Sequence, residues 1–372
     1  MFTASELMPA IQPVQDWYLQ HARTLPWRSD PTPYHVWISE IMLQQTRVEA
    51  VIPYYERFIR ELPDVEALSV CPEETYLKLW EGLGYYSRVR NLHAAACQIM
   101  EQYGGELPSE YEALRKLKGI GPYTAGAIAS IAFQQPEPAV DGNVLRVLMR
   151  LTGDASDIML QSTKTMVEDG LRTVMQQWNQ ECMETEKKLL LQPRILTQAL
   201  MELGALVCVP NGAPHCDICP WQTLCRAHAE GLTEQLPVKK KAKERRIEER
   251  TVLILRDGSR AAIHKRPGKG LLAGLYELPN RLGHMTQDEV AAYVKSMGFA
   301  ALRIEPLEPA RHIFSHIEWQ MIGYVVKIEE AGLASETELR LREREELIFT
   351  DADEVAERYA IPTAFSTYVG YV

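Results

Sequence analysis

The chain has 372 residues, of which 46% are hydrophobic, and a formal net charge of −10 at pH 7. A chain of this length is too long to fold around one ordinary hydrophobic core, so the sequence predicts two domains, with three as the alternative. No apolar run is long enough to span a bilayer, and we therefore expect a soluble protein. The acidic balance excludes a protein that is basic throughout, yet a local DNA-binding face remains possible because charge acts locally. The first twelve residues lack the features of an export signal, and we expect a cytoplasmic protein.

The first part of the chain has the periodicity of helices. From Trp17 to about Cys225 apolar residues recur at spacings of three and four, and glycines at 104–105, 119–121 and 141–143 predict loops between helices. Glu40 is a lone carboxylate in this apolar pattern. Desolvation would raise its pKa and suit it to act as a general acid at neutral pH, whereas a glutamate that points to solvent is the alternative.

Two glycine-containing turns follow. Residues 82–88 predict a flexed turn that exposes Leu83 and Tyr85, with packing of these side chains in the core as the alternative. Residues 117–126 predict a helix, a tight turn at Gly119 and Gly121, and a second helix. Amide groups at the start of the second helix would bind a phosphate without reading a base, and a turn that only joins two helices is the alternative.

Asp141 lies before the predicted helical run 145–151, at a place that is typical of an N-cap. The same place would also hold a carboxylate near a nucleic-acid backbone that the hairpin at 117–126 has bound. The residues alone leave both interpretations open.

Four of the seven cysteines lie in one short segment, separated by seven, two and five residues, and they are Cys208, Cys216, Cys219 and Cys225. This clustering is typical of metal chemistry in a reducing compartment, and four thiolates suit a [4Fe–4S] cluster or tetrahedral zinc. The segment resembles the cluster loop of the endonuclease III and MutY family of DNA glycosylases, whose first gap is one residue shorter. The resemblance implies one [4Fe–4S] cluster per chain with a structural and DNA-positioning role. His215, in the longer gap, is a less favoured substitute ligand.

The pattern LxGxGxxTAG at 117–126 resembles the helix-hairpin-helix of the same family, which implies that Gly119 and Gly121 contact the DNA backbone. Strand-cleaving members carry a lysine nucleophile where this chain has Tyr123, and a phenol cannot form a Schiff base. The resemblance therefore implies a monofunctional glycosylase, with Tyr123 beside the flipped nucleotide.

The string VDGNV at 140–144 resembles the catalytic aspartate loop of the family, and ISEIMLQQT at 38–46 resembles the MutY branch in particular. This resemblance implies that Glu40 protonates adenine at N7, that Asp141 stabilises the oxocarbenium-like sugar or forms a transient covalent intermediate, and that Asn143 orients Asp141 and the attacking water. The implied substrate is adenine opposite 8-oxoguanine, or opposite guanine, in double-stranded DNA.

The resemblance implies further contacts, because the adenine must leave the base stack before it can react. Tyr85 would wedge beside the 8-oxoguanine with Leu83 nearby, while Gln45 and Thr46 approach the gap left by the adenine. The residues implied around the adenine pocket or the neighbouring backbone are Arg23, Trp27, Arg28 and Gln198.

After Arg250 the pattern changes to strands at 251–255, 261–264 and 321–328 and a helix at 287–297. The string GLLAGLYELP at 270–279 resembles the Nudix-like domain of MutY, but the glutamate box of a working Nudix hydrolase does not follow it, and the run Arg342–Glu346 is interpreted as a solvated surface. The family's lesion-recognition loop is matched at 312–316, where Ser315 would hydrogen-bond the 8-oxoguanine; a β-turn with a buried phenylalanine is the alternative. The recognition residues implied there are Phe314, Ser315 and His316.

The sequence therefore predicts a multidomain protein, α followed by α+β, with a helix-hairpin-helix glycosylase core, a [4Fe–4S] cluster loop and a C-terminal Nudix-like domain. The predicted glycosylase region is 1–227, divided into a six-helix barrel at 28–135 and a cluster subdomain formed by 1–27 with 136–227. A basic interdomain linker at 228–248 and the Nudix-like domain at 249–372 follow. We interpret the linker as a charged connector, with contact to the phosphate backbone as the alternative.

Three other functions are alternatives to adenine excision. An endonuclease III-like glycosylase/lyase for oxidised pyrimidines is disfavoured by Tyr123, and a non-catalytic iron–sulfur sensor of DNA damage by the presence of both Glu40 and Asp141. A Nudix hydrolase with an added DNA-binding domain is disfavoured by the missing glutamate box. The expected partner is mispaired duplex DNA, and the expected state is a monomer.

Overall fold

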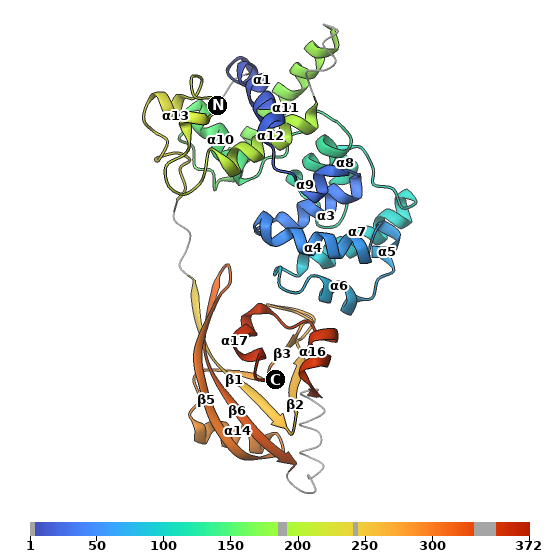
Figure 1. Cartoon of the computed structure of the whole chain (residues 1–372), viewed down its shortest axis with the longest axis vertical. Coiled ribbons are helices and arrows are strands. Elements are labelled where there is room, and N and C mark those ends of the chain that lie inside the picture. Colours follow the sequence, from blue (N-terminus) through green and yellow to red (C-terminus); the bar gives the residue numbers. More distant parts are fainter. Residues whose placement is uncertain (1–3, 185–191, 241–244, 331–346) are drawn as a thin grey trace. The chain divides into compact units, whose positions relative to one another are not determined.

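The computed structural model describes residues 4–184, 192–240, 245–330 and 347–372, so the predicted solvated run 342–346 lies outside the described residues. The chain divides into two compact units, residues 1–70 with 91–241 and residues 71–90 with 242–372 (Figure 1). The first is helical and the second combines a sheet with helices, as predicted. Among the described residues, no helix combines the length and the apolar character that a membrane span requires.

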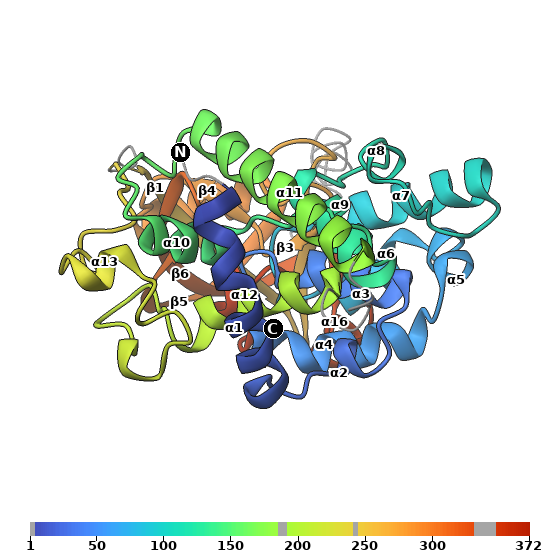
Figure 2. The same ribbon diagram turned by 90° about the horizontal axis from the view of Figure 1, so that it is seen from above.

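The first unit is built from helices joined by short loops. Its elements are α1 (Ala4–His21), α2 (Pro26–Ser29), α3 (Pro33–Leu43), α4 (Val48–Glu61), α5 (Val65–Ser69), most of α7 (Ser87–Tyr103), α8 (Tyr111–Leu114), α9 (Pro122–Ala127), the π-helical turn η1 (Ile128–Ala132), α10 (Gly142–Thr152), α11 (Gln161–Glu184), α12 (Pro193–Leu206), the 3₁₀ turn η2 (Cys216–Ile218) and α13 (Arg226–Ala229). Helix α1 packs against α12 and α11, and α10 packs against α12 (Figures 1 and 2).

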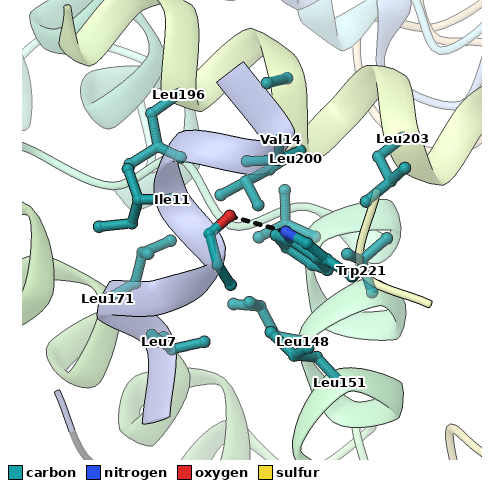
Figure 3. Close-up of a cluster of buried hydrophobic side chains, with 14 of the residues drawn as sticks. Leu7, Ile11, Val14, Leu148, Leu151, Leu171, Leu196, Leu200, Leu203 and Trp221 are labelled. Atoms are coloured by element: carbon teal, nitrogen blue, oxygen red, sulfur yellow. Dashed lines mark hydrogen bonds between the residues drawn. The ribbon is translucent and has the colours of Figure 1, made fainter. Parts of the chain in front are cut away.

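The apolar faces of these helices form a buried core (Figure 3), and three residues of the cysteine segment, Cys208, Cys219 and Cys225, pack against it. Trp221, which lies between the third and fourth cysteines of that segment, is buried in this core. Its indole N–H donates a hydrogen bond to the Ala10 carbonyl of α1 at 2.7 Å. Because burial of a tryptophan strongly favours the folded state, this contact fixes the cysteine segment to the helical core.

Helix α10 begins at Gly142, three residues before the predicted run. The Asp141 carboxylate accepts the Val144 N–H at 2.7 Å and so caps the helix. Gly153, with φ of 67°, ends the helix in the left-handed conformation that glycine adopts at low cost.

The second unit contains α6 (Glu73–Leu79) and a mixed sheet. Its other elements are β1 (Arg246–Asp257), β2 (Arg260–Lys265), β3 (Tyr276–Glu277), β4 (Asn280–Leu282), α14 (Gln287–Ser296), β5 (Phe299–Ile313), β6 (Ile317–Glu330), β7 (Ile348–Thr350), α16 (Ala352–Arg358), η3 (Thr363–Phe365) and α17 (Ser366–Val369). The strand order is β3-β2-β1-β6-β5, with β4 beside β1 and β7 beside β2. Strands β1 and β6 are parallel, and the other pairs are antiparallel. The predicted strands and helix are confirmed, and the strands are longer than predicted.

Both faces of this sheet are covered, because successive side chains of a strand point to opposite sides. Val252 and Ile254 of β1 pack in the cluster that contains Phe365 and residues of α16 and α17. Leu253 and Leu255 belong to the opposite cluster, with residues of α14. Because both faces of the sheet are covered, β1 contains a continuous run of apolar residues.

Parts of the range 228–248 belong to folded elements. Leu236 is buried in the first unit, and the Val238 carbonyl accepts the Ile158 N–H at 3.1 Å. Strand β1 begins at Arg246. The backbone hydrogen bonds of these segments thus leave a shorter connector than the charge pattern predicts.

Candidate active site

The first unit contains a pocket lined by residues from several elements. It combines ionisable groups with apolar walls, and its lining includes Arg23, Trp27, Arg28, Glu40, Thr46, Tyr123, Ile131, Asp141, Asn143, Gln198 and Glu202. The structure thus brings together the predicted catalytic residues Glu40, Tyr123, Asp141 and Asn143, although they come from α3, α9 and the beginning of α10.

Glu40 projects from α3 and is only 6% exposed. The pKa of its carboxyl group is raised to about 7, mainly because of burial. The hydrogen bond from Tyr123 lowers this pKa, and the negative charge of Asp141 raises it further. The Tyr123 hydroxyl donates to Oε2 of Glu40, and burial raises the pKa of this phenol well above its ordinary value. Tyr123 therefore stays a neutral donor, and the Glu40 carboxyl titrates near neutral pH.

Asp141 keeps both carboxylate oxygens hydrogen-bonded. Oδ1 accepts the Val144 N–H at 2.7 Å, and Oδ2 accepts the Asn143 side-chain amide at 2.8 Å. Burial raises the pKa of Asp141, and these two hydrogen bonds act in the opposite direction. The N-cap interpretation and the catalytic one are compatible, because the carboxylate that caps α10 also lines the pocket.

Asn143 is itself held in place by Arg146 of the same helix, which also binds the neighbouring helix α12. Nη2 of the buried Arg146 donates to Oδ1 of Asn143 at 2.8 Å and to the Gly204 carbonyl of α12 at 2.7 Å. A Cβ atom at Gly204 would lie 2.6 Å from Cβ of Asn143. The helix pair can approach this closely only with glycine at that position.

A second glycine acts in the same way near Asp141. A Cβ atom at Gly126 would lie 1.9 Å from the carbonyl oxygen of Pro138, in the segment that leads to the aspartate. Gly126 belongs to the hairpin pattern, but the pattern gives no sign of this contact. Gly204 has no motif at all, and only its occurrence inside an apolar helix marks it as unusual.

Glu202 of α12 is a charged pocket residue that the sequence did not indicate. Its side chain is 1% exposed and binds the Arg23 guanidinium at 2.9 Å and the Arg28 guanidinium at 2.8 Å. Burial alone would raise the pKa of Glu202, but the hydrogen bonds from the two arginines lower it to about 2. In the sequence this residue is one acid in an amphipathic helix, and its partners lie far away along the chain.

The predicted DNA contacts around the pocket have different surroundings. Thr46 lines the pocket, whereas Gln45 is exposed and has φ of 60°, a conformation that costs a non-glycine residue free energy. Gly119 has φ of 76°, as expected for the tight turn. Gly121 has φ of −87°, so its backbone does not require glycine, but the space beside its Cα is open. The proposed roles of these residues in binding DNA remain predictions.

The structure gathers the four predicted cysteine ligands around one small pocket. Arg150 and His215 share the lining, and Nη1 of Arg150 donates to Sγ of Cys208 at 3.2 Å. Burial and the nearness of the other three thiols raise the pKa of Cys219 to about 12. Across the described part of the chain, no group of three or more His, Cys, Asp or Glu residues has the geometry of a site for one metal ion.

A separate cavity of about 660 Å³ lies within the second unit. Its walls are the turn 82–87, residues 270–273, the β5–β6 loop 312–316 and residues 362–364. The Tyr85 hydroxyl lies 3.4 Å from Oγ of Ser315, and the Tyr85 side chain is 49% exposed with φ of 48°. Leu83 is 7% exposed, so the prediction of an exposed apolar pair is wrong for this residue: its side chain packs inward.

The β5–β6 loop combines the two interpretations that the sequence left open. Phe314 is partly buried and makes edge contacts with Trp319 and His312, while its N–H donates to the Ile317 carbonyl at 2.8 Å. The loop is a turn stabilised by a packed phenylalanine, and it presents Ser315 and His316 to the cavity.

The fold and the pocket define a class of repair protein. Residues 38–179 match the family described as HhH-GPD superfamily base excision DNA repair protein, and residues 250–370 match the NUDIX domain. The adenine DNA glycosylase of Mus musculus is 35% identical over 373 residues, which cover 85% of this chain and 70% of the mouse protein. The adenine DNA glycosylase of Buchnera aphidicola (strain Bp) is 33% identical, and the match covers 82% of this chain and 82% of that protein. The chain belongs to the adenine DNA glycosylase family.

The solved structures agree with this fold. A thermostable thymine-DNA glycosylase superposes with a TM-score of 0.51 at 23% identity, covering 61% of this chain and 98% of that protein. At this identity the likeness shows the fold alone.

Proposed function

We propose that this enzyme, which belongs to the adenine DNA glycosylase family of base excision repair, removes adenine paired with 8-oxoguanine. It would also remove adenine paired with guanine, at a lower rate. The observation that carries the proposal is the presence of two carboxyl groups in one pocket, Asp141 and the buried Glu40, whose pKa is raised to about 7. Neutral adenine leaves a sugar poorly, so an acid and an anion that stabilises a cation are the minimum that this reaction needs.

The proposed reaction has two stages. Protonated Glu40 gives its proton to N7 of the extruded adenine, and the C1′–N9 bond breaks with its electron pair moving to the base. The Asp141 carboxylate stabilises the resulting oxocarbenium ion or bonds to C1′ for a short time. Water, oriented by Asn143, then attacks C1′ and passes its proton to the vacated Glu40 carboxylate.

Tyr123 supports a monofunctional reaction. Its phenol occupies the position where strand-cleaving relatives are expected to carry a lysine, and it donates a hydrogen bond to Glu40. A phenol forms no Schiff base, so the product is an abasic site in an intact strand.

The cavity of the second unit supports a reader for the opposite base. It has the volume of a small-molecule site, and two of its walls offer the aromatic ring of Tyr85 and the hydroxyl of Ser315, whose oxygen lies 3.4 Å from the Tyr85 hydroxyl. We assign 8-oxoguanine to this cavity, with Ser315 as its hydrogen-bonding partner.

The four thiols that line one small pocket are a donor set that suits an iron–sulfur cluster. Cys208, Cys216, Cys219 and Cys225 would hold a [4Fe–4S] cluster. When bound, the cluster supplies a covalent tie across this segment and no step of the excision. Arg150 would donate a hydrogen bond to the Cys208 thiolate.

One assay tests the reaction and its specificity. Duplexes with adenine opposite 8-oxoguanine, guanine or thymine, labelled on the adenine strand, are incubated with the protein and analysed before and after alkali. We expect free adenine from the first two duplexes, fastest opposite 8-oxoguanine, and strand breakage only after alkali. Breakage without alkali would indicate a lyase, and binding without release of adenine would indicate a damage sensor.

A further inference from the structure

Two walls of the cavity in the second unit are constructed in the same way. In the turn 82–87, Nη2 of the buried Arg88 donates to the Leu83 carbonyl at 3.0 Å and to the Gly84 carbonyl at 3.1 Å. The next residue, Tyr85, has a positive φ of 48°. In this wall, an arginine thus binds the backbone carbonyls that directly precede a residue with a strained backbone conformation.

A second wall, between β2 and β3, repeats this arrangement. Nε of Arg266 donates to the Leu271 carbonyl at 3.0 Å, and the next residue, Leu272, has φ of 56°. A left-handed conformation costs a leucine about 1–3 kcal/mol and persists only where the surroundings impose it. Leu272 is partly buried and lines the cavity, as Tyr85 does.

A buried carboxylate holds this second arginine. Glu277 of β3 is buried and forms an ion pair with Arg266, and its Oε1 lies 3.1 Å from Nε2 of His264. Burial alone would raise the pKa of Glu277, but His264 and Arg266 lower it below its ordinary value, so the carboxylate stays charged. Buried ion pairs contribute little net stability compared with apolar packing, and their better attested use is to select one conformation.

We propose that Arg266 and Glu277 are positioning residues for discrimination between 8-oxoguanine and guanine: they hold Leu272 as an apolar wall against a base seated beside Tyr85 and Ser315. An apolar wall excludes water from the hydrogen bond between Ser315 and the base, which strengthens that bond. This inference rests on the proposed function of the cavity.

The test measures binding, so that it does not depend on catalysis. Full-length protein is titrated with duplexes that carry uncleavable 2′-fluoro-2′-deoxyadenosine opposite 8-oxoguanine or guanine, and fluorescence anisotropy gives both Kd values. We expect Arg266→Met and Glu277→Gln each to lower the preference for 8-oxoguanine about tenfold, while the Kd for the guanine duplex stays unchanged. The double variant should match the single ones, because the two residues act as one unit.

Arg303→Met is the matched control, since Arg303 forms an exposed ion pair with Glu305 on β5, away from the cavity. Thermal unfolding is recorded for every variant. If Arg266→Met fails to fold, Arg266→Lys keeps the charge beside Glu277 but lacks the planar fork, and it should lower the preference by a smaller factor.

The possible results separate this inference from the function on which it rests. Folded variants that keep the wild-type preference would overturn the positioning role of Arg266 and Glu277 and leave the lesion reader intact. An equal loss of affinity for both duplexes would also overturn it, because that result indicates a general structural role. Wild-type protein without any preference would overturn the lesion reader and the positioning role together.

Discussion

Glu40 illustrates how one residue can be costly for stability and useful for chemistry. Its buried carboxyl group is only partly compensated by the hydrogen bond from Tyr123. Because burial raises its pKa from 4.5 to about 7, the native protein binds this proton more tightly than the unfolded chain does. The stability contributed by this proton is complete below about pH 4.5 and is lost as the pH rises through about 7.

This pH dependence leads to a prediction for Glu40→Gln. The amide oxygen still accepts from Tyr123 but carries no charge, so we expect the free energy of unfolding at pH 8 to exceed that of wild type by up to about 3 kcal/mol. At pH 4 the two proteins should be equally stable. Denaturant titrations at both pH values measure this difference, and a variant that is less stable than wild type at pH 8 would contradict it.

The same residue sets the expected pH profile of catalysis. Wild-type excision under single-turnover conditions should decrease as the pH rises through about 7, because only protonated Glu40 can act as the acid. Glu40→Gln should lower the rate by about 10²–10⁴-fold. A wild-type rate that is independent of pH between 6 and 8 would argue against Glu40 as the acid that limits the reaction.

Asp141 has two roles that a single substitution can separate. Asparagine also accepts the Val144 N–H, so Asp141→Asn should preserve the cap of α10 and change the melting temperature little. Loss of the negative charge should lower adenine release by about 10²–10³-fold. Parallel measurement of melting temperature and single-turnover rate tests both statements. An active Asp141→Asn protein would leave the cap as the only role of this residue.

At the scale of elements, the pocket depends on close approach between α9, α10 and α12. These contacts place Asp141 and Asn143 beside Glu40, although the helices that carry them are separate in the sequence. Gly126 and Gly204 permit the approach because a side chain at either position would overlap its neighbour. A rigid backbone contact, not a catalytic side chain, thus fixes the geometry of the carboxylates.

We therefore expect Gly126→Ala to weaken both stability and catalysis. The added methyl group would overlap the Pro138 carbonyl, and relief of this overlap must shift the segment that carries Asp141. The cost in unfolding free energy should be about 1–3 kcal/mol, with a lower excision rate. Gly142→Ala is the stability control, because a methyl group there meets no atom within 4 Å. Equal stability of the two variants would contradict this account.

At the scale of the whole molecule, the cysteine segment 208–225 is joined to the helical core through Trp221 and Arg150. Arg150 also donates to the Leu236 carbonyl at 2.8 Å, which fixes the chain just before the connector. Metal bound by the four thiols would add to the stability of this region, since a preformed site does not exist in the unfolded chain.

The corresponding prediction concerns Cys216→Ser. We expect the purified wild-type protein to contain iron and sulfide and to absorb visible light, and the variant to lose iron and melt at a lower temperature. Cys97→Ser is the matched control, because Cys97 is an exposed thiol on α7 outside the segment. Zinc in place of iron, or full iron content in Cys216→Ser, would contradict the proposed ligand set.

The sequence by itself determined the features that depend on neighbouring residues. Asp141 caps the helix that follows it, the cysteine spacing brings four thiols to one loop, and the strands of the second unit follow the alternation of apolar side chains. The helical and α+β parts were predictable for the same reason, since periodicity is a local property.

Only the tertiary structure decided the features that join distant segments. Glu202 binds Arg23, which lies 179 residues away in the sequence, and Arg28, which lies 174 residues away. Residues 71–90 group with the C-terminal part of the chain. Leu83 packs inward, although the turn that contains it predicted an exposed side chain. Such contacts arise when separate helices bury their apolar faces together, and the packing of those faces leaves no periodic signal in the sequence. The candidate catalytic residues could therefore be named in advance, but Glu202 and the backbone contacts that hold the pocket together could not.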